Sequence, residues 1–135
     1  MKRFLSLFLA FLIAVGVLST SMLSIDVSAT TEADLTFQLT ESGSSYYVSA
    51  CNRNAGGYVN IPAYYNGLPV TEIGESAFEK SGLTSVKVPA KVTEISKRAF
   101  AECAELTTAT LPNTVTKIGV QAFDQCVKLS NMVSE

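Results

Sequence analysis

The chain has 135 residues, a formal net charge of −2 and no histidine. The absence of histidine excludes the Ser-His and Cys-His dyads of nucleophilic catalysis and removes the commonest metal ligand. Ten Lys and Arg residues stand against twelve Asp and Glu residues with no basic run, which argues against nucleic acid as a partner.

Residues 1–29 have the order of a secretory signal peptide. Two basic residues precede an apolar run, and small residues follow it up to Ala29, after which we expect cleavage. The alternative is an uncleaved anchor, because the uncharged stretch 4–25 approaches the roughly 20 residues of a membrane-spanning helix. Its apolar centre, 4–18, has the length of a signal core, so we predict a secreted or cell-surface protein that meets the membrane only through its signal peptide.

Residues 30–57 are predicted to form an N-terminal β-hairpin cap. Segments 35–39 and 46–50 alternate apolar and polar residues on either side of a turn rich in Ser and Gly. A stack of repeats exposes an apolar end unless something covers it. We therefore expect the hairpin to cover the first coil.

Residues 58–135 repeat with a period of 22 to 23 residues. Ala-Phe dipeptides at 77–78, 99–100 and 122–123 mark the period, and each Phe follows an isoleucine by five residues and a valine by eight. Such periods are typical of leucine-rich repeats, whose coils bury their apolar faces only by stacking on their neighbours. The expected fold is therefore a β-rich leucine-rich-repeat solenoid of about three coils, with a partial last coil.

Three segments carry a family resemblance: "VTEIGESAF", "VPAKVTEISKRAFAEC" and "LPNTVTKIGVQAFDQC". They resemble the BspA-like leucine-rich repeats of bacterial surface proteins, and the resemblance covers residues 58–128. One departure is Ser96, which stands where the other coils have Gly74 and Gly119, and we expect a glycine there to serve a turn. The resemblance implies attachment to host proteins or to other cells.

Each coil is expected to hold a strand, a corner and a return side. In "LTSVKVP" the side chains of Leu83, Val86 and Val88 point inward. The return side should hold short helical turns that place one Phe per coil in an interior column. The first coil carries extra residues, which we expect to form a loop at about 63–68.

The outward side of the strands is the candidate ligand face. It is small and rich in hydroxyl groups, and leucine-rich repeats usually bind partners on this side. Its residues are Thr84, Ser85, Lys87, Thr107, Thr108 and Thr110. A second candidate is an aromatic patch at Tyr64 and Tyr65, because Tyr is favoured at binding hot spots; packing of these rings in the cap is the alternative.

The cysteines fit a structural column better than a reactive site. Cys103 and Cys126 occupy the slot that holds Ser81 in the first coil, which suggests small buried side chains. Neighbouring coils hold such residues about 5 Å apart, so a disulfide between Cys103 and Cys126 is within reach. Cys51 belongs to the hairpin, and no C-x-x-C spacing indicates a metal site.

No catalytic, cofactor-binding or metal-ligating residues are predicted. The many carboxylates take outward positions that are indifferent to the sign of the charge, as expected of a solvated face. We expect a non-catalytic binding module that recognises a protein or a glycan outside the cell. The alternative is a structural stalk, or a fragment of a larger surface protein, with no ligand of its own.

Overall fold

A computed structural model describes residues 34–135, and the signal peptide expected at residues 1–29 lies outside this range. Within the described range, no helix combines the length and the apolar character needed to cross a membrane. The strands are β1 (Leu35–Leu39), β2 (Tyr46–Cys51), β3 (Gly56–Asn60), β4 (Tyr64–Tyr65), β5 (Leu68–Ile73), β6 (Gly82–Lys87), β7 (Glu94–Ile95), β8 (Thr108–Leu111), β9 (Lys117–Ile118) and β10 (Asn131–Ser134).

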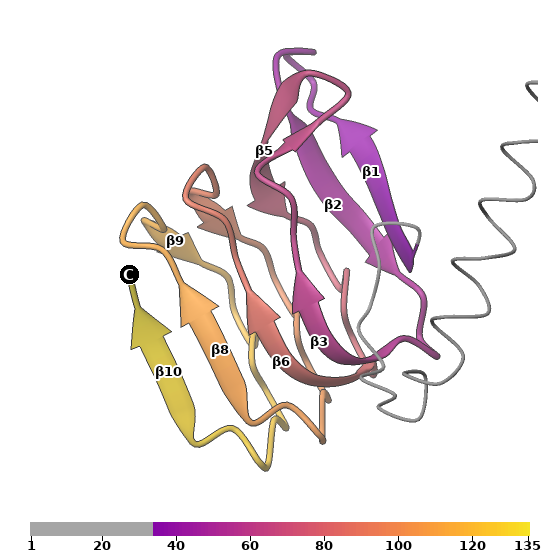
Figure 1. Cartoon of the computed structure of the whole chain (residues 1–135), viewed down its shortest axis with the longest axis vertical. Helices are drawn as coiled ribbons and strands as arrows, with labels where there is room; N and C mark the ends of the chain where they lie inside the picture. The colour runs from indigo at the N-terminus through magenta and orange to yellow at the C-terminus, as the bar shows by residue number, and fades with distance from the viewer. Residues whose placement is uncertain (1–33) are drawn as a thin grey trace, which may run out of the picture.

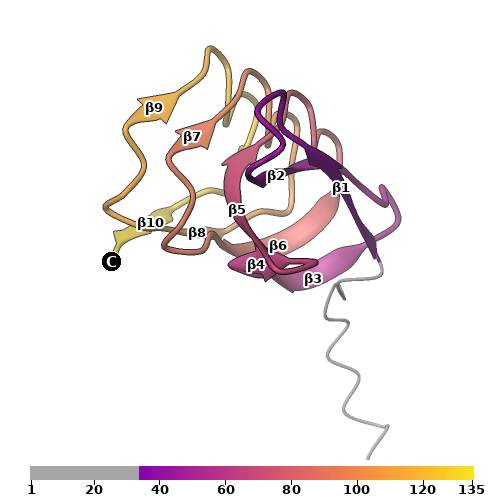
Figure 2. The same cartoon turned by 90° about the horizontal axis from the view of Figure 1, so that it is seen from above.

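The strands form two facing sheets (Figures 1 and 2). The front sheet has the order β10-β8-β6-β3, and all its neighbours are parallel. The back sheet has the order β1-β2-β5-β7-β9, with the short β4 attached to β5. The chain passes from a front strand to a back strand and returns once per coil, which is the solenoid that the period predicts.

The coils stack in register. Glu72 and Ile73 pair with Glu94 and Ile95, and this pair continues to the equivalent residues of β9. In the front sheet Val86 pairs with Ala109. Equivalent residues therefore lie directly above one another, so their buried side chains form continuous interior columns.

The interior is dominated by a column of parallel phenylalanine rings. Phe78 and Phe100 lie 4.9 Å apart at 7°, and Phe100 and Phe123 lie 5.1 Å apart at 6°. Backbone hydrogen bonds join the same coils beside these rings. The N–H of Phe78 donates to the carbonyl of Ala99, and the N–H of Phe100 donates to the carbonyl of Ala122. Phe78 and Phe100 are fully buried.

The expected helical turns are hydrogen-bonded turns in the described part of the chain, without an assigned α-helix. In each coil, the residues two before and two after the phenylalanine have a left-handed backbone. In the second coil these are Arg98, with φ of 55°, and Glu102, with φ of 58°. A left-handed residue interrupts a right-handed helix, so none of these segments extends into one.

The N-terminal hairpin joins the back sheet. β1 runs antiparallel to β2, as expected, and β2 lies parallel to β5 with Val48 opposite Ile73. Val48 thus occupies the place of the repeated isoleucine, and it is fully buried. The hairpin therefore covers the N-terminal end of the back sheet.

The loop expected at 63–68 is a tight hairpin instead. β4 and β5 pair antiparallel, with Tyr65 opposite Leu68. The two residues between them, Asn66 and Gly67, have φ of 47° and 81°. Two positive φ angles are what a two-residue hairpin turn requires, and Asn-Gly is the preferred sequence for it.

The C-terminal end of the stack presents apolar side chains to solvent. A groove of about 410 Å³ lies there between β8, β9 and β10, and its lining includes Leu111, Val115, Ile118 and Met132. Ile118 and Met132 are each more than half exposed, although their counterparts in earlier coils are buried. The interior of the solenoid is thus open at this end of the described chain.

Candidate ligand-binding face

The six predicted ligand-face residues lie in β6, in β8 and at the residue before β8. Thr84, Lys87 and Thr107 are exposed, and Ser85, Thr108 and Thr110 are partly exposed. Ser85 lies opposite Thr108, and Lys87 lies opposite Thr110. The hydroxyl and the backbone N–H of Thr107 both donate to the carbonyl of Thr84, at 2.9 and 2.8 Å. In each of these pairs the two residues lie on neighbouring strands, about one strand spacing apart. Their role in binding remains a prediction.

The face extends beyond the predicted residues onto the two outer strands. Tyr58 lies opposite Ser85 and Asn60 opposite Lys87 on β3. On β10, Asn131 lies opposite Thr108 and Val133 opposite Thr110. The signal for β3 was in the sequence, because the flanking Val59 and Ile61 are inward apolar residues of the same alternation and are buried.

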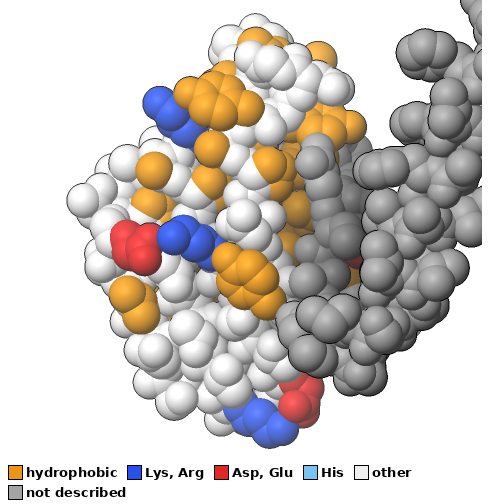
Figure 3. Space-filling view, in the orientation of Figure 1, with side chains coloured by type: hydrophobic (Ala, Val, Ile, Leu, Met, Phe, Trp, Pro, Cys, Tyr) orange, Lys and Arg blue, Asp and Glu red, His pale blue; other side chains and the backbone are white. Residues whose placement is uncertain are grey.

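The face carries little charge. Figure 3 shows its middle as mainly white, the colour of backbone, hydroxyl and amide groups, with few charged atoms. Lys87 is the only charged residue in the four front strands. Its Nζ lies 3.0 Å from Oε2 of Glu135, and this hydrogen bond and ion pair raise the pKa of Lys87.

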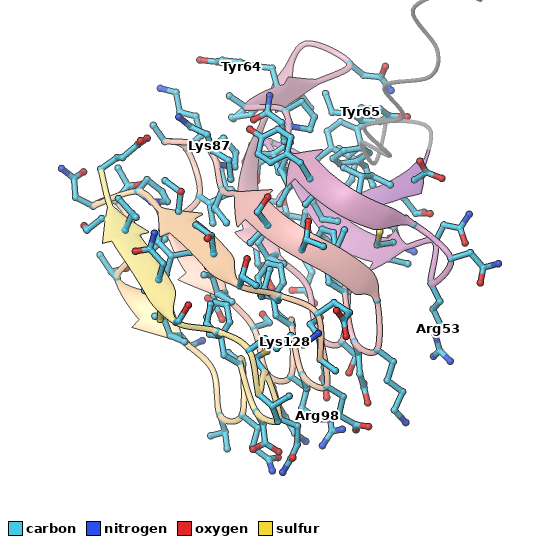
Figure 4. All side chains as sticks on the ribbon, turned by 60° about the horizontal axis from the view of Figure 1, so that its bottom comes forward. Arg53, Tyr64, Tyr65, Lys87, Arg98 and Lys128 are labelled. Carbon is cyan, nitrogen blue, oxygen red and sulfur yellow. The ribbon has the colours of Figure 1, made fainter. Side chains whose placement is uncertain are left out.

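The two residues of the expected aromatic patch, Tyr64 and Tyr65, point to opposite sides of strand β4 (Figure 4). Tyr64 is 55% exposed. Tyr65 is partly buried, because its ring stacks on Phe37 at 4.2 Å and meets the edge of Tyr46 at 5.0 Å. Neighbouring residues of a strand point to opposite sides. Tyr65 therefore packs under the cap, and of this pair only Tyr64 presents its ring to solvent.

The cysteine slot is a column of small polar groups that is buried at Ser81 and Cys103 and partly buried at Cys126. The thiol of Cys103 donates to the carbonyl of Phe78 at 3.0 Å and lies 3.3 Å from the hydroxyl of Ser81. One coil further on, the thiol of Cys126 donates to the carbonyl of Phe100 at 3.0 Å. Both cysteines are free thiols here, and their pairing under oxidising conditions remains a prediction.

Cys51 of the hairpin extends the backbone ladder of the phenylalanine column and packs against the hydrophobic core. Its backbone N–H donates to the carbonyl of Ala77, the bond that each phenylalanine makes to the next coil. Burial raises the pKa of both Cys51 and Cys126 to about 11. Since the thiolate is the nucleophile, these thiols are poorly reactive at neutral pH.

The turn side carries paired charges. Arg98 donates to Glu79 at 2.8 Å and to Glu102 at 2.9 Å. The hydrogen bond from Arg98 lowers the pKa of Glu79 to about 2. Among the described residues, no three carboxylates or cysteines gather as a metal site would require. Glu79 and Glu102 are both paired with Arg98.

A family model described as "BspA type Leucine rich repeat region (6 copies)" matches residues 59–135. This match covers more than half of the chain, and it agrees with the stacked, 22-to-23-residue coils of the structure. The chain belongs to the BspA-type leucine-rich-repeat family, which confirms the resemblance seen in the sequence.

Solved structures of bacterial leucine-rich-repeat proteins have the same fold. A T. pallidum leucine-rich-repeat protein is 29% identical with a TM-score of 0.72, over 78% of this chain and 49% of that one. A leucine-rich cell surface protein from Faecalibacterium prausnitzii is 34% identical with a TM-score of 0.64, over 75% of this chain and 29% of that one.

A leucine-rich-repeat protein from Bacteroides capillosus is 25% identical with a TM-score of 0.55, over 80% of this chain and 99% of that one. The chain thus matches about half or less of the length of the first two proteins. No curated protein matches it.

Proposed function

We propose that this protein is a non-catalytic recognition module of the cell exterior that binds a protein or glycan partner through its front sheet. The observation that carries the proposal is the outward face of that sheet, an ordered surface of hydroxyl and amide groups held by a rigid stack. Groups fixed on regular strands lose little conformational freedom on binding.

The extracellular location rests on two further observations. The order of residues 1–29 is that of a secretory signal peptide. One structural neighbour, from Faecalibacterium prausnitzii, is described as a cell surface protein. Both favour a chain that works outside the cytoplasm, where an adhesion role of the kind implied by the family would act.

The test is capture of host matrix proteins and mucin glycans by the purified chain. A triple variant, Thr84→Glu with Lys87→Glu and Thr108→Glu, places acidic groups across the face and should abolish capture. A control triple, Ser44→Glu with Asn54→Glu and Lys97→Glu, changes the net charge equally at exposed sites elsewhere. Unchanged capture by the first triple would remove the proposed face.

A structural role as one segment of a longer stack is the second candidate. The apolar groove at the C-terminal end favours it, because a solenoid coil normally buries such a surface against the next coil. A chain with this role alone would bind nothing in the capture assay.

A further inference from the structure

The inference concerns the surroundings of Lys87, the only charged residue in the strands of the front sheet. Asn60 and Thr110 lie opposite it on the two neighbouring strands. Tyr58, two residues before Asn60 on β3, is its diagonal neighbour and is 40% exposed. One cation therefore stands beside an amide, a hydroxyl and an aromatic ring.

This lysine already holds a carboxylate. Glu135 follows β10 and reaches across β8 to place its Oε2 3.0 Å from Nζ of Lys87. Both side chains are about half exposed, at 46% for the lysine and 56% for the glutamate. An exposed pair of this kind contributes roughly 0 to 1 kcal/mol, so an incoming carboxylate can displace Glu135 at small cost.

The rest of the face suits a sugar better than a protein. Protein hot spots are enriched in tryptophan, tyrosine and arginine anchors, and of these residue types the four front strands carry only Tyr58. Hydroxyl and amide groups at Ser85, Thr108 and Asn131 instead offer hydrogen bonds to sugar hydroxyls, and the ring of Tyr58 offers an apolar platform.

We propose that Lys87 and Tyr58 form the centre of a binding site for a carboxylated sugar of the uronic acid class, with Glu135 as an internal competitor for the lysine. The inference rests on the proposed function, because it names a ligand class for the same face. Lys87 binds the sugar carboxylate as a point charge, and the neighbouring hydroxyl and amide groups set the orientation of the ring.

The experiment is calorimetric titration of the purified chain with trigalacturonic acid and with its methyl ester, which has the same rings without the charge. The acid should bind and the ester should bind far more weakly. Lys87→Gln should weaken acid binding by about tenfold or more, since it removes a hydrogen bond to a charged group. Glu135→Gln should strengthen it by about threefold, because the competitor is gone.

A second ion pair provides the matched control. Lys128, labelled in Figure 4, and Glu105 lie 2.7 Å apart and are similarly exposed. Both stand in the turns that lead into strands rather than in the strands of the face. Lys128→Gln and Glu105→Gln should leave the affinity for the acid unchanged. Equal weakening by Lys128→Gln and Lys87→Gln would mean general charge attraction and would overturn the proposal.

Two further outcomes would also overturn it. An unchanged affinity for the acid in Glu135→Gln would contradict the role of Glu135 as a competitor for Lys87. Equal binding of the acid and the ester would contradict the role of the sugar carboxylate. In a third outcome, trigalacturonic acid does not bind, but another partner binds the wild-type chain and does not bind the Thr84, Lys87 and Thr108 triple variant. That result would support the front sheet as the binding face and would contradict the acidic sugar as its ligand. Circular dichroism of each variant checks that it is folded.

Discussion

At the scale of single residues, the spacing between coils decides which side chains the repeat tolerates. A Cβ on Gly74 would lie 2.7 Å from the carbonyl oxygen of Val48, and one on Gly119 would lie 2.4 Å from the backbone nitrogen of Lys97. Neither glycine has a positive φ. These glycines therefore serve a close approach between coils, and not the turn geometry that the sequence suggested.

Gly119→Ala should destabilise the protein by about 1 to 3 kcal/mol, because backbone atoms must move to admit the methyl group. The measurement is urea unfolding followed by circular dichroism. Ser96→Ala is the control at the same slot, since it keeps the Cβ and loses one hydrogen bond to Glu72. An unfolding midpoint for Gly119→Ala at the same urea concentration as the wild type would contradict a close approach of the coils at Gly119.

The pairing of Glu79 with Arg98 predicts a dependence of stability on acid. The folded-state pKa of Glu79, about 2, is below the ordinary value of 4.5. As the pH falls, Glu79 is therefore protonated in the unfolded chain before it is protonated in the folded one. Its contribution to the free energy of unfolding is complete above pH 4.5 and disappears as the pH falls towards 2. In Glu79→Gln the midpoint of thermal unfolding should therefore fall less steeply than in the wild type as the pH is lowered from 6 to 2. The same dependence of the midpoint on pH in both proteins would contradict the pairing.

At the scale of elements, the phenylalanine column links one coil to the next. Phe100 is fully buried between two parallel rings, whereas Phe123 is only partly buried at the open end. The energetic cost of removing a ring depends on how much surface it buries and on how far the site can collapse.

Phe100→Ala should therefore cost on the order of 3 to 5 kcal/mol, which approaches the whole stability of a small domain. Phe123→Ala should cost less, because part of its ring already contacts water. Guanidinium unfolding of both variants compares them directly. If Phe123→Ala lowers the free energy of unfolding as much as Phe100→Ala or more, the phenylalanine column does not stabilise the stacked coils in the way described.

The repeated elements could be predicted from sequence because each position recurs. The residues of the repeat, such as Ile73, Ile95 and Phe100, each have counterparts at the same offset, so their burial follows from stacking alone. The Asn66-Gly67 turn has a local signal of its own, because Asn-Gly favours a two-residue hairpin, but this signal does not recur with the period. The turn pairs β4 with β5, and within β4 Tyr64 is exposed while Tyr65 packs on Phe37.

The candidate site was only partly predictable. Alternation about the inward Val86 placed Ser85 and Lys87 on the face, and Thr84 is the extra residue at the register shift between β3 and β6. The contact between Lys87 and Glu135, however, crosses an intervening strand. Such a pair depends on how far each strand reaches and on the rotamers of two long side chains. A repeat alignment contains neither quantity.

At the scale of the whole molecule, the two ends of the stack differ. The N-terminal end of the back sheet is covered by the β1–β2 hairpin, while the C-terminal end exposes Ile118, Met132 and Val133 beside an apolar groove. An apolar end of this kind lowers the stability of a solenoid and promotes association.

One further consensus coil fused after Glu135 should therefore raise the midpoint of thermal unfolding and reduce the binding of a hydrophobic dye. The reason is that the new coil buries Ile118 and Met132 and pairs the free edge of β10. Calorimetry and dye fluorescence measure the two effects. A fusion of equal length made from Gly and Ser is the control, and equal results from the two fusions would contradict this reading of the C-terminal end.

The central claim is that the partner binds on the outward face of the front sheet, and mapping of backbone amide chemical shifts on titration with a captured partner tests it most directly. The account predicts shifts along β3, β6 and β8, centred on Tyr58, Ser85 and Lys87. Shifts confined to the hairpin around Tyr64, or to the groove beside Ile118, would contradict it.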